Sequence, residues 1–466
     1  IRVPFPHLAV IIMRRRFQRK PVRSIVVFDL GRKPEMNNPH KLLPVSACIL
    51  LLAAVTASVQ AQNPQQQRID SPVNILRQGM DQTKALKVTD AIYQAVGFGN
   101  TFMVITSEGN VIIDTSNVIA APHHMKLLKA ENAGPVKYII LTHGHSDHTG
   151  GVPLWKGPDT KVIAQRNNVE FLNYQSRLGG FFAFRNAAQF SLPAPTAPPS
   201  AANSGARLHA DILFDDKYEF TLGGVKFELF STPGETPDHL TVWIPQYKAA
   251  FTGDNYYESF PNMYTLRGTQ PRWALDYINS LNKVMALGPE ILLPSHGRPV
   301  IGTALIGRTL TRYRDAIQYV HDAVVRGMNA GKDVFTLMRE IKLPADLDVG
   351  EGYGKLTWSI RGIYEGYAGW FDMNPATMYE VPPSSVYPDI ARLAGGADAL
   401  AKAALARVEA GQPVEALHLT AIALTAEPGN APAVAARLKA LEYLRDHSQN
   451  TNERGWLTYS IGLLKK

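Results

Sequence analysis

Residues 137–151 read KYIILTHGHSDHTGG, and this stretch decides the fold class. After Lys137, four apolar residues in a row predict a buried strand. Three histidines and one aspartate follow within six residues, namely His143, His145, Asp147 and His148. Neutral imidazole and carboxylate groups crowded into a small space are the donors that zinc and similar divalent metals prefer. The stretch therefore predicts a strand that ends in a metal site.

Outward from this stretch, the sequence alternates between short strand-like runs and helical spacing. Strands are expected at residues 92–96, 102–105, 111–113, 137–141, 161–164, 218–222, 225–230, 240–244, 249–252 and 291–293. Helices are expected within 116–129, 168–174 and 271–287. Strands followed by a helix, twice over, predict two packed sheets with helices outside. Residues 181–206 are rich in proline, alanine and serine, and we expect a long loop over the site.

The pattern His-x-His-x-Asp-His resembles the hallmark of the metallo-β-lactamase superfamily. That resemblance implies an αβ/βα sandwich with two zinc ions at one edge and further ligands at later strand ends. Segments 231–239, 251–254 and 294–297 resemble the later motifs and supply His239, Asp254 and His296. The resemblance assigns one metal to His143, His145 and His239. It assigns the other metal to Asp147, His148 and His296, with Asp254 as the bridge.

The resemblance also implies hydrolytic chemistry. Two metals lower the pKa of a bridging water from ~15.7 toward ~7, and the resulting hydroxide attacks an electrophilic centre. Asp147 is the expected catalytic residue, because its carboxylate can orient the hydroxide and carry a proton. Asp114 resembles the aspartate that lies behind the ligand loop in this family and orients it.

Longer motifs resemble the alkylsulfatase-like branch. They lie at residues 262–268, 354–371 and 455–456, and the similarity spans roughly residues 75–466. It implies a metallo-β-lactamase domain at 75–302 and an all-α dimerisation domain at 303–466, hence a homodimer. Two departures stand out. Linear alkylsulfatases carry glutamates where this sequence has His239 and Asp254, and the sequence ends before the sterol-carrier-like domain of fuller members.

Three residues are candidate substrate contacts, namely Asn262, Thr265 and Arg267. A guanidinium fork suits a tetrahedral oxyanion such as a sulfate ester. The alternative is that Arg267 only holds a loop in place. Aromatic residues in the segment 364–371 are expected either to line a site for an apolar tail or to pack a dimer.

Three functions from different classes follow from these motifs. The first is a zinc hydrolase of alkyl sulfate esters, and the second is a lactone or β-lactam hydrolase that uses the same site. The third, a metal-binding module without catalysis, is disfavoured because the ligand set is complete. In the first two cases the partner is a small-molecule substrate.

Charge and the N-terminal segment bear on location and partners. The net charge is +8, but residues 1–61 hold ten of the 48 basic side chains and two of the 40 acidic ones. Residues 62–466 therefore carry 38 of each and offer no basic field for nucleic acid.

Residues 36–61 resemble a signal peptide and indicate a periplasmic or secreted protein. The apolar run of this segment is too short for an integral membrane span. Residues 1–35 are interpreted as a non-native upstream extension, with a genuine basic extension as the alternative.

Overall fold

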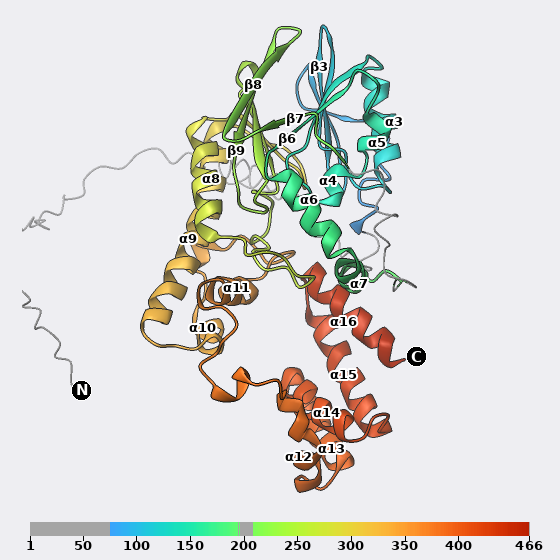
Figure 1. The fold of residues 1–466 in the computed structure, drawn as a ribbon, viewed down its shortest axis with the longest axis vertical. Helices are drawn as coiled ribbons and strands as arrows, with labels where there is room; N and C mark the ends of the chain where they lie inside the picture. Colours follow the sequence, from blue (N-terminus) through green and yellow to red (C-terminus); the bar gives the residue numbers. More distant parts are fainter. Residues whose placement is uncertain (1–74, 194, 196–207, 466) are drawn as a thin grey trace, which may run out of the picture. The chain divides into compact units, whose positions relative to one another are not determined.

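The computed structural model describes residues 75–193, 195 and 208–465. The predictions for the upstream extension at 1–35 and the signal peptide at 36–61 lie outside the described residues, as does most of the expected loop beyond residue 195. Two β-sheets with helices between their strands come first in the chain, and a region of helices follows (Figure 1).

The first sheet has seven strands in chain order. They are β1 (Leu86–Lys87), β2 (Ile92–Ala95), β3 (Thr101–Thr106), β4 (Gly109–Ile113), β5 (Val136–Ile140), β6 (Lys161–Gln165) and β7 (Ile212–Phe214). Strands β1 to β4 pair antiparallel, whereas β4 to β7 pair parallel. The carboxyl ends of the parallel strands β4 and β5 consequently lie at one edge, which is where Asp114 and His143 follow them.

The second sheet has six strands in the order β13-β12-β11-β10-β9-β8. They are β8 (Lys217–Leu222), β9 (Val225–Ser231), β10 (Leu240–Ile244), β11 (Ala249–Gly253), β12 (Ile291–Pro294) and β13 (Val300–Ile301). Gly223 and Gly224 join β8 to β9 with φ of 51° and 81°. Two positive φ angles in a two-residue hairpin favour glycine at both positions. Strands β11 and β12 are parallel, so the residues after them share an edge of this sheet.

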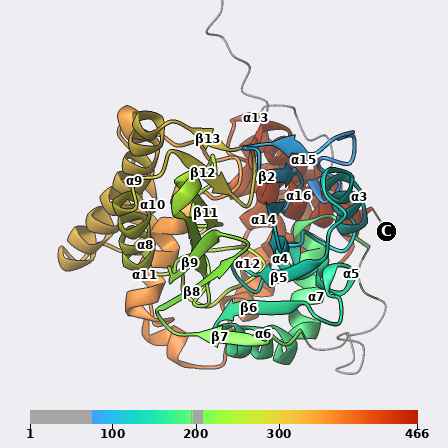
Figure 2. The same ribbon diagram turned by 90° about the horizontal axis from the view of Figure 1, so that it is seen from above.

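The two sheets face each other across a common core. Alternate residues of β3 show why, because Phe102 and Val104 pack against the second sheet while Met103 faces outward. Helices α3 (Ala121–Glu131) and α5 (Val152–Trp155) cover the outer face of the first sheet. Helices α8 (Ala274–Ala286) and α9 (Thr303–Asn329) cover that of the second. Figure 2 shows the two pairs of helices on opposite sides of the sheets, and the predicted αβ/βα sandwich is confirmed.

Several elements differ from the sequence prediction, among them the two-residue strands β1 and β13, which were not predicted. Residues 179–189 form helix α7 (Gly179–Gln189), which follows α6 (Asn168–Arg177), whereas we predicted a loop from residue 181. The prediction was wrong there because glycines, alanines and phenylalanines without polar alternation gave no clear helical period, and packing decides instead. Strand β7 was also missed, since its three residues are ordered by pairing with β6.

After residue 303, the regular elements of the described chain are helices. The main ones are α9, α10 (Val334–Glu340), α11 (Leu356–Ala368), α12 (Tyr387–Leu393), α13 (Ala397–Glu409), α14 (Pro413–Ala426), α15 (Ala431–His447) and α16 (Thr451–Leu464). This confirms the expected helical region after the sandwich. Within the part of the chain that the structure describes, no helix has the length and apolar character needed to cross a membrane.

Candidate metal centre

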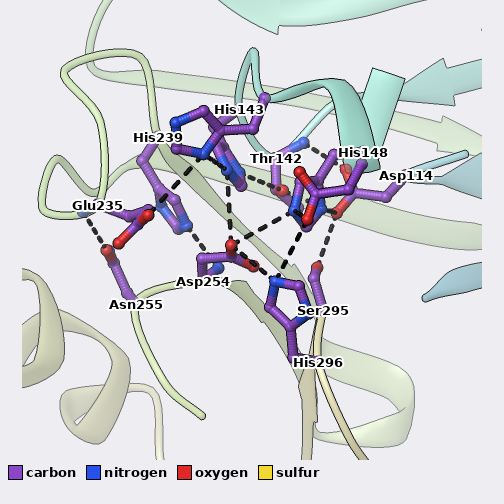
Figure 3. Close-up of polar contacts among 12 residues, drawn as sticks. Asp114, Thr142, His143, His148, Glu235, His239, Asp254, Asn255, Ser295 and His296 are labelled. Atoms are coloured by element: carbon purple, nitrogen blue, oxygen red, sulfur yellow. Dashed lines mark hydrogen bonds and ion pairs between the residues drawn. The ribbon is translucent and has the colours of Figure 1, made fainter. Parts of the chain in front are cut away.

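Strand ends bring the predicted ligands together at one edge of the sandwich (Figure 3). The ligand loop after β5 contributes four of them, and its Ser146–Thr149 segment forms the short helix α4. His239 precedes β10, Asp254 follows β11 and His296 follows β12. The parallel pairs β4–β5 and β11–β12 thus place their carboxyl-terminal residues on the same edge.

The donor atoms form two groups that share one carboxylate. Asp147, His148, Asp254 and His296 make one group, and His143, His145 and Asp254 make the other, with the ligand atoms of each group within 4.8 Å of one another. The Oδ2 atom of Asp254 lies 2.9 Å from His296 Nε2, 3.3 Å from His148 Nε2 and 3.7 Å from His143 Nε2. Asp254 is therefore the carboxylate that both donor groups share.

Buried polar atoms in this cluster lack partners. Among the described residues, His148 Nε2 and Asp254 Oδ1 are buried without a hydrogen bond. Carboxylate oxygens of Asp254 and Asp147 lie 3.3 Å and 3.4 Å from His148 Nε2, at ion-pair distance. Buried polar groups are otherwise almost always satisfied. Unpartnered nitrogen and oxygen donors that face one another fit divalent metal ions, which such donors bind.

The charge around His148 also fits a cation. Burial alone would lower the pKa of His148, but the carboxylates of Asp254, Asp147 and Asp114 outweigh burial and raise the pKa well above its usual range. Three carboxylates around one imidazole leave an excess of negative charge in a buried space. A divalent cation would neutralise that excess. A single proton on the His148 imidazole offsets only one of the three negative charges.

The histidines of the other group have the opposite tendency. Burial, together with the neighbouring His148, holds the pKa of His143 well below its usual range. Burial and the Arg267 guanidinium do the same for His145. Both imidazoles are therefore neutral at pH 7, the form that binds metals. His143 Nε2 and His145 Nδ1 lie 2.8 Å apart and face each other.

His239 lies beside the cluster but in neither donor group. Its ring stacks on His143 with the centroids 5.3 Å apart, and burial lowers its pKa to about 4. The Nε2 atom accepts the backbone N–H of Asp254 at 3.0 Å. Of the seven predicted ligands, His239 is thus the one that the structure places against the cluster rather than within a group of donors.

Asp114 fixes the ligand loop from behind. Its Oδ1 accepts the backbone N–H of Thr142 at 2.8 Å, and its Oδ2 accepts the Thr142 hydroxyl at 2.8 Å and the Ser295 hydroxyl at 2.7 Å. The same Oδ2 lies 2.9 Å from His148 Nδ1. Because Nδ1 of His148 is held by this carboxylate, Nε2 is directed toward the other donors.

Replacing Asp114 with alanine is expected to weaken metal binding about 10- to 100-fold, the range for partners that orient a ligating histidine. A competitive chelator titration measures the affinity. Ser295→Ala is the matched control, because it removes one of the contacts to Asp114 and leaves the carboxylate on His148. An unchanged metal affinity in Asp114→Ala would mean that the loop holds His148 without the carboxylate.

Asp147, the predicted catalytic residue, lies on the accessible side of the cluster. Its side chain is 19% exposed and that of His296 18%, whereas His143 and His148 are fully buried. Burial alone would raise the pKa of Asp147, but His148 and His296 outweigh burial and hold the pKa below its usual range. Asp147 is consequently a carboxylate at neutral pH, and it faces the accessible side of the cluster.

Of the three predicted substrate contacts, Arg267 reaches the metal cluster. Its Nη2 lies 3.4 Å from His145 Nε2, and its Nε is buried without a partner among the described residues. Thr265 is buried and donates its hydroxyl to Gln189 Oε1 at 3.3 Å. The side-chain oxygen of Asn262 is buried without a described partner, and its backbone carbonyl accepts from Arg272 at 2.8 Å. Arg267 therefore offers a free donor beside the cluster.

Sequence reasoning missed a buried acidic residue in the same place. Glu235 Oε1 lies 3.8 Å from His145 Nδ1, the nitrogen that faces the cluster. The carboxylate accepts hydrogen bonds from Arg272 and from the Tyr277 hydroxyl, the latter at 2.7 Å. Glu235 belongs to the segment 231–239, which resembles a ligand loop, and this position could have marked it as a site residue. Nothing in the sequence indicates that it pairs with Arg272. The Phe98 carbonyl, which contacts His296 Nδ1, was missed for the same reason.

Two regions of the chain match known protein families. Residues 95–296 match the metallo-β-lactamase superfamily, and residues 336–464 match the alkyl sulfatase dimerisation family. The first match contains the strands from β3 to β12 and all seven predicted ligands. The second covers the helices from α10 to α16.

Curated relatives and a solved structure are similar over most of the chain. A linear primary-alkylsulfatase of Pseudomonas sp. (strain ATCC 19151) is 28% identical over 382 residues, covering 77% of this chain and 72% of that enzyme. An alkyl/aryl-sulfatase of Saccharomyces cerevisiae is 27% identical over 412 residues, covering 81% of this chain and 63% of that enzyme. The stereoselective inverting sec-alkylsulfatase Pisa1 from Pseudomonas sp. superposes with a TM-score of 0.74 at 25% identity, covering 82% of this chain and 65% of that structure.

These matches extend through the sandwich and the helical region, and the chain spans less than two thirds of the yeast enzyme and of the solved Pseudomonas structure. The chain therefore carries a metallo-β-lactamase domain followed by an alkyl sulfatase dimerisation domain, and its similarity to alkylsulfatases supports the alkylsulfatase-like branch of the metallo-β-lactamase superfamily.

Proposed function

We propose that this protein is a binuclear zinc hydrolase of alkyl sulfate esters. The observation that carries the substrate class is Arg267, whose guanidinium lies against His145 with an unpartnered buried Nε. A sulfate ester has a fixed negative charge and three oxygens that accept hydrogen bonds. A guanidinium with free donors beside a metal cluster matches both properties. The alkylsulfatases among the relatives support the same class.

The residues of the two donor groups would hold the metals. His143 and His145, with His239 next to them, would bind one ion, and Asp147, His148 and His296 the other, with Asp254 between them. A bound pair of zinc ions supplies positive charge and acidifies a water molecule beside the ester. Asp147 would orient a water molecule beside the ester and would be placed to take up a proton from it. Arg267 offsets the charge of the sulfate group.

We expect two zinc ions per protomer. The two donor groups, each with nitrogen and carboxylate donors, are the physical reason. Elemental analysis after zinc supplementation and gel filtration measures the ratio. One ion or fewer per protomer at neutral pH would contradict a binuclear site and leave only a mononuclear mechanism.

An assay panel tests the proposed function. The panel contains a primary alkyl sulfate, a secondary alkyl sulfate, a lactone and a β-lactam, each with the zinc-loaded enzyme and with enzyme stripped by chelator. We expect zinc-dependent release of sulfate from at least one alkyl ester. Turnover of the lactone or β-lactam alone would favour the alternative, which the three-histidine set with bridging Asp254 supports. If the enzyme turns over none of the four substrates, the result would favour the third function, a metal-binding module without catalysis.

We propose that the helical region forms a homodimer. Between α11 and the end of α12, large apolar side chains are exposed, among them Trp370 at 76% and Leu393 at 79%. The full set is Trp370, Phe371, Met373, Met378, Tyr379, Val381, Val386, Ile390 and Leu393. Monomeric proteins rarely expose so many apolar residues in one segment. The segment lies within the match to the alkyl sulfatase dimerisation family, which supports a second copy of this chain as its partner.

The double substitution Trp370→Ser and Leu393→Ser is expected to shift the protein from dimer to monomer. Loss of one large buried anchor typically costs about 2 kcal/mol of binding free energy, or roughly 30-fold in the dissociation constant. Light scattering over a dilution series measures the mass. Val118→Ser is the matched control, because Val118 is also exposed, at 72%, but lies in the other domain. A monomeric wild-type protein at micromolar concentration would exclude the dimer.

We also propose that the protein acts in the periplasm or outside the cell. The support is the sequence of residues 36–61, in which a short polar start precedes an apolar run and small residues. Expression of the full reading frame followed by N-terminal sequencing of the exported protein tests this. A mature chain that begins near residue 62 is expected, and retention of the segment in a cytoplasmic product would overturn the proposal.

A further inference from the structure

The segment that carries Arg267 has no regular secondary structure, so its position depends on contacts with other elements. Helix α7 provides them. Arg185 donates from Nε to the Arg267 carbonyl at 2.7 Å and from Nη2 to the Leu266 carbonyl at 2.5 Å. Both bonds come from one planar guanidinium, which fixes the two peptide groups relative to α7.

A second residue of α7 holds the other side of the segment. Gln189 is fully buried, and its Oε1 accepts the backbone N–H of Arg267 at 3.1 Å and the Thr265 hydroxyl at 3.3 Å. Arg267 is thus held at its N–H by Gln189 and at its carbonyl by Arg185. Because both backbone groups of Arg267 are fixed, the direction in which its side chain leaves the backbone toward His145 is fixed as well.

Helix α16, at the end of the helical domain, supports α7. Gly455 packs directly on the backbone of Gln189, and a Cβ atom at residue 455 would overlap the Gln189 carbonyl. The Ser191 hydroxyl donates to the Gly455 carbonyl at 3.2 Å. The Arg185 guanidinium also lies over the Trp456 ring, 5.5 Å from its centroid. The contacts continue without a gap from α16 through α7 to Arg267.

We propose that Arg185 and Gln189 are positioning residues for Arg267, and that α16 sets the place of α7 for this purpose. The inference rests on the proposed function, in which Arg267 meets the sulfate group. It adds that the helical domain contributes to the geometry of the metal site of its own chain. Helix α16 therefore affects hydrolysis.

A double-mutant cycle tests the role of Arg185. Arg185→Met is expected to lower kcat/KM for an alkyl sulfate about 10- to 100-fold, because displacement of a binding group by about 1 Å has effects of this size. In the Arg267→Ala background the same change should cost less than about twofold, since the residue that Arg185 positions is already gone. Arg185→Lys should restore part of the activity. Losses that multiply in the double variant would show that Arg185 acts independently of Arg267 and overturn the proposal.

Arg177→Met is the control for this cycle. Arg177 lies on the neighbouring helix α6, is largely exposed and pairs with Glu170. The substitution removes an arginine close to α7 in the chain without touching the Arg267 segment. We expect wild-type kinetics, and a loss equal to that of Arg185→Met would overturn the specific role of Arg185.

A paired glycine substitution tests the role of α16 without any substrate. Gly455→Ala forces α16 away from Gln189, whereas Gly462→Ala on the same helix adds a methyl group in open space. Hydrogen exchange of the full-length zinc-loaded protein is the measurement. The Arg267 amide, which donates to Gln189, should exchange at least about tenfold faster in Gly455→Ala and in Arg185→Met, and at the wild-type rate in Gly462→Ala.

The two measurements separate this inference from the proposed function. If the wild-type enzyme cleaves no alkyl sulfate but exchange changes as expected, the function is wrong and the positioning by α7 and α16 stands. If the enzyme cleaves alkyl sulfates and exchange of the Arg267 amide is the same in all variants, the function stands and the positioning is wrong. Gly455→Ala that fails to fold leaves Arg185→Met as the deciding variant.

Discussion

Replacing Asp254 with alanine is expected to lower kcat/KM about 10⁴-fold on whichever substrate the enzyme turns over best, the scale seen when one member of a catalytic unit is removed. Asp254 belongs to both donor groups, and its Oδ2 lies within 3.7 Å of imidazole nitrogens from His143, His148 and His296. Its loss removes a ligand from each site at once. The remaining carboxylates no longer link the two groups, so the metal content should fall together with the activity.

Elemental analysis and steady-state kinetics on the same preparations check this expectation. Asp276→Ala is the matched control, because Asp276 is a partly exposed aspartate on α8 that belongs to neither donor group. It should keep both metals and full activity. Asp254→Ala with a full metal complement and wild-type turnover would show that the two sites do not share this carboxylate.

The sequence predicted the sandwich and the ligand loop at 143–148 because both follow from local pattern. The predicted strand at 137–141 corresponds to β5 (Val136–Ile140), and ligands at the ends of parallel strands meet at one edge of each sheet. The later ligands came from the family resemblance rather than from spacing, because they lie far from the ligand loop in the chain. His239 came from the same resemblance, and in the structure its Nε2 accepts the Asp254 N–H.

What the sequence did not predict depends on tertiary contacts. Helix α7 has little helical signal of its own, but its Arg185 and Gln189 bond the Arg267 segment and Gly455 packs on its backbone. The buried pair of Glu235 with Arg272 likewise joins residues 37 positions apart, with no pattern to connect them. Neither arrangement has a period that a sequence window can detect.

Arg267→Ala is expected to lower kcat/KM for alkyl sulfates about 10²- to 10³-fold, the usual cost of removing one donor to a developing or fixed anion. The guanidinium lies beside the cluster, with Nη2 3.4 Å from His145 Nε2, so its positive charge is next to the place where the sulfate group would bind. A neutral lactone has no such charge to meet. Its hydrolysis, where the enzyme shows any, should change less than about threefold, and the metal content should stay the same.

Two further variants distinguish the guanidinium fork from simple positive charge. Arg267→Lys keeps the charge but loses the planar fork, so it should recover only part of the loss on alkyl sulfates. Arg298→Ala removes an exposed positive charge two residues after His296, and it should leave both substrates unaffected because solvent screens that charge. Inorganic sulfate as an inhibitor gives an independent measure of the anion contact, and its inhibition constant should rise in Arg267→Ala. Equal losses on sulfate ester and lactone would instead mean that Arg267 supports the position of His145, since the two side chains touch, and that sulfate specificity resides in other residues.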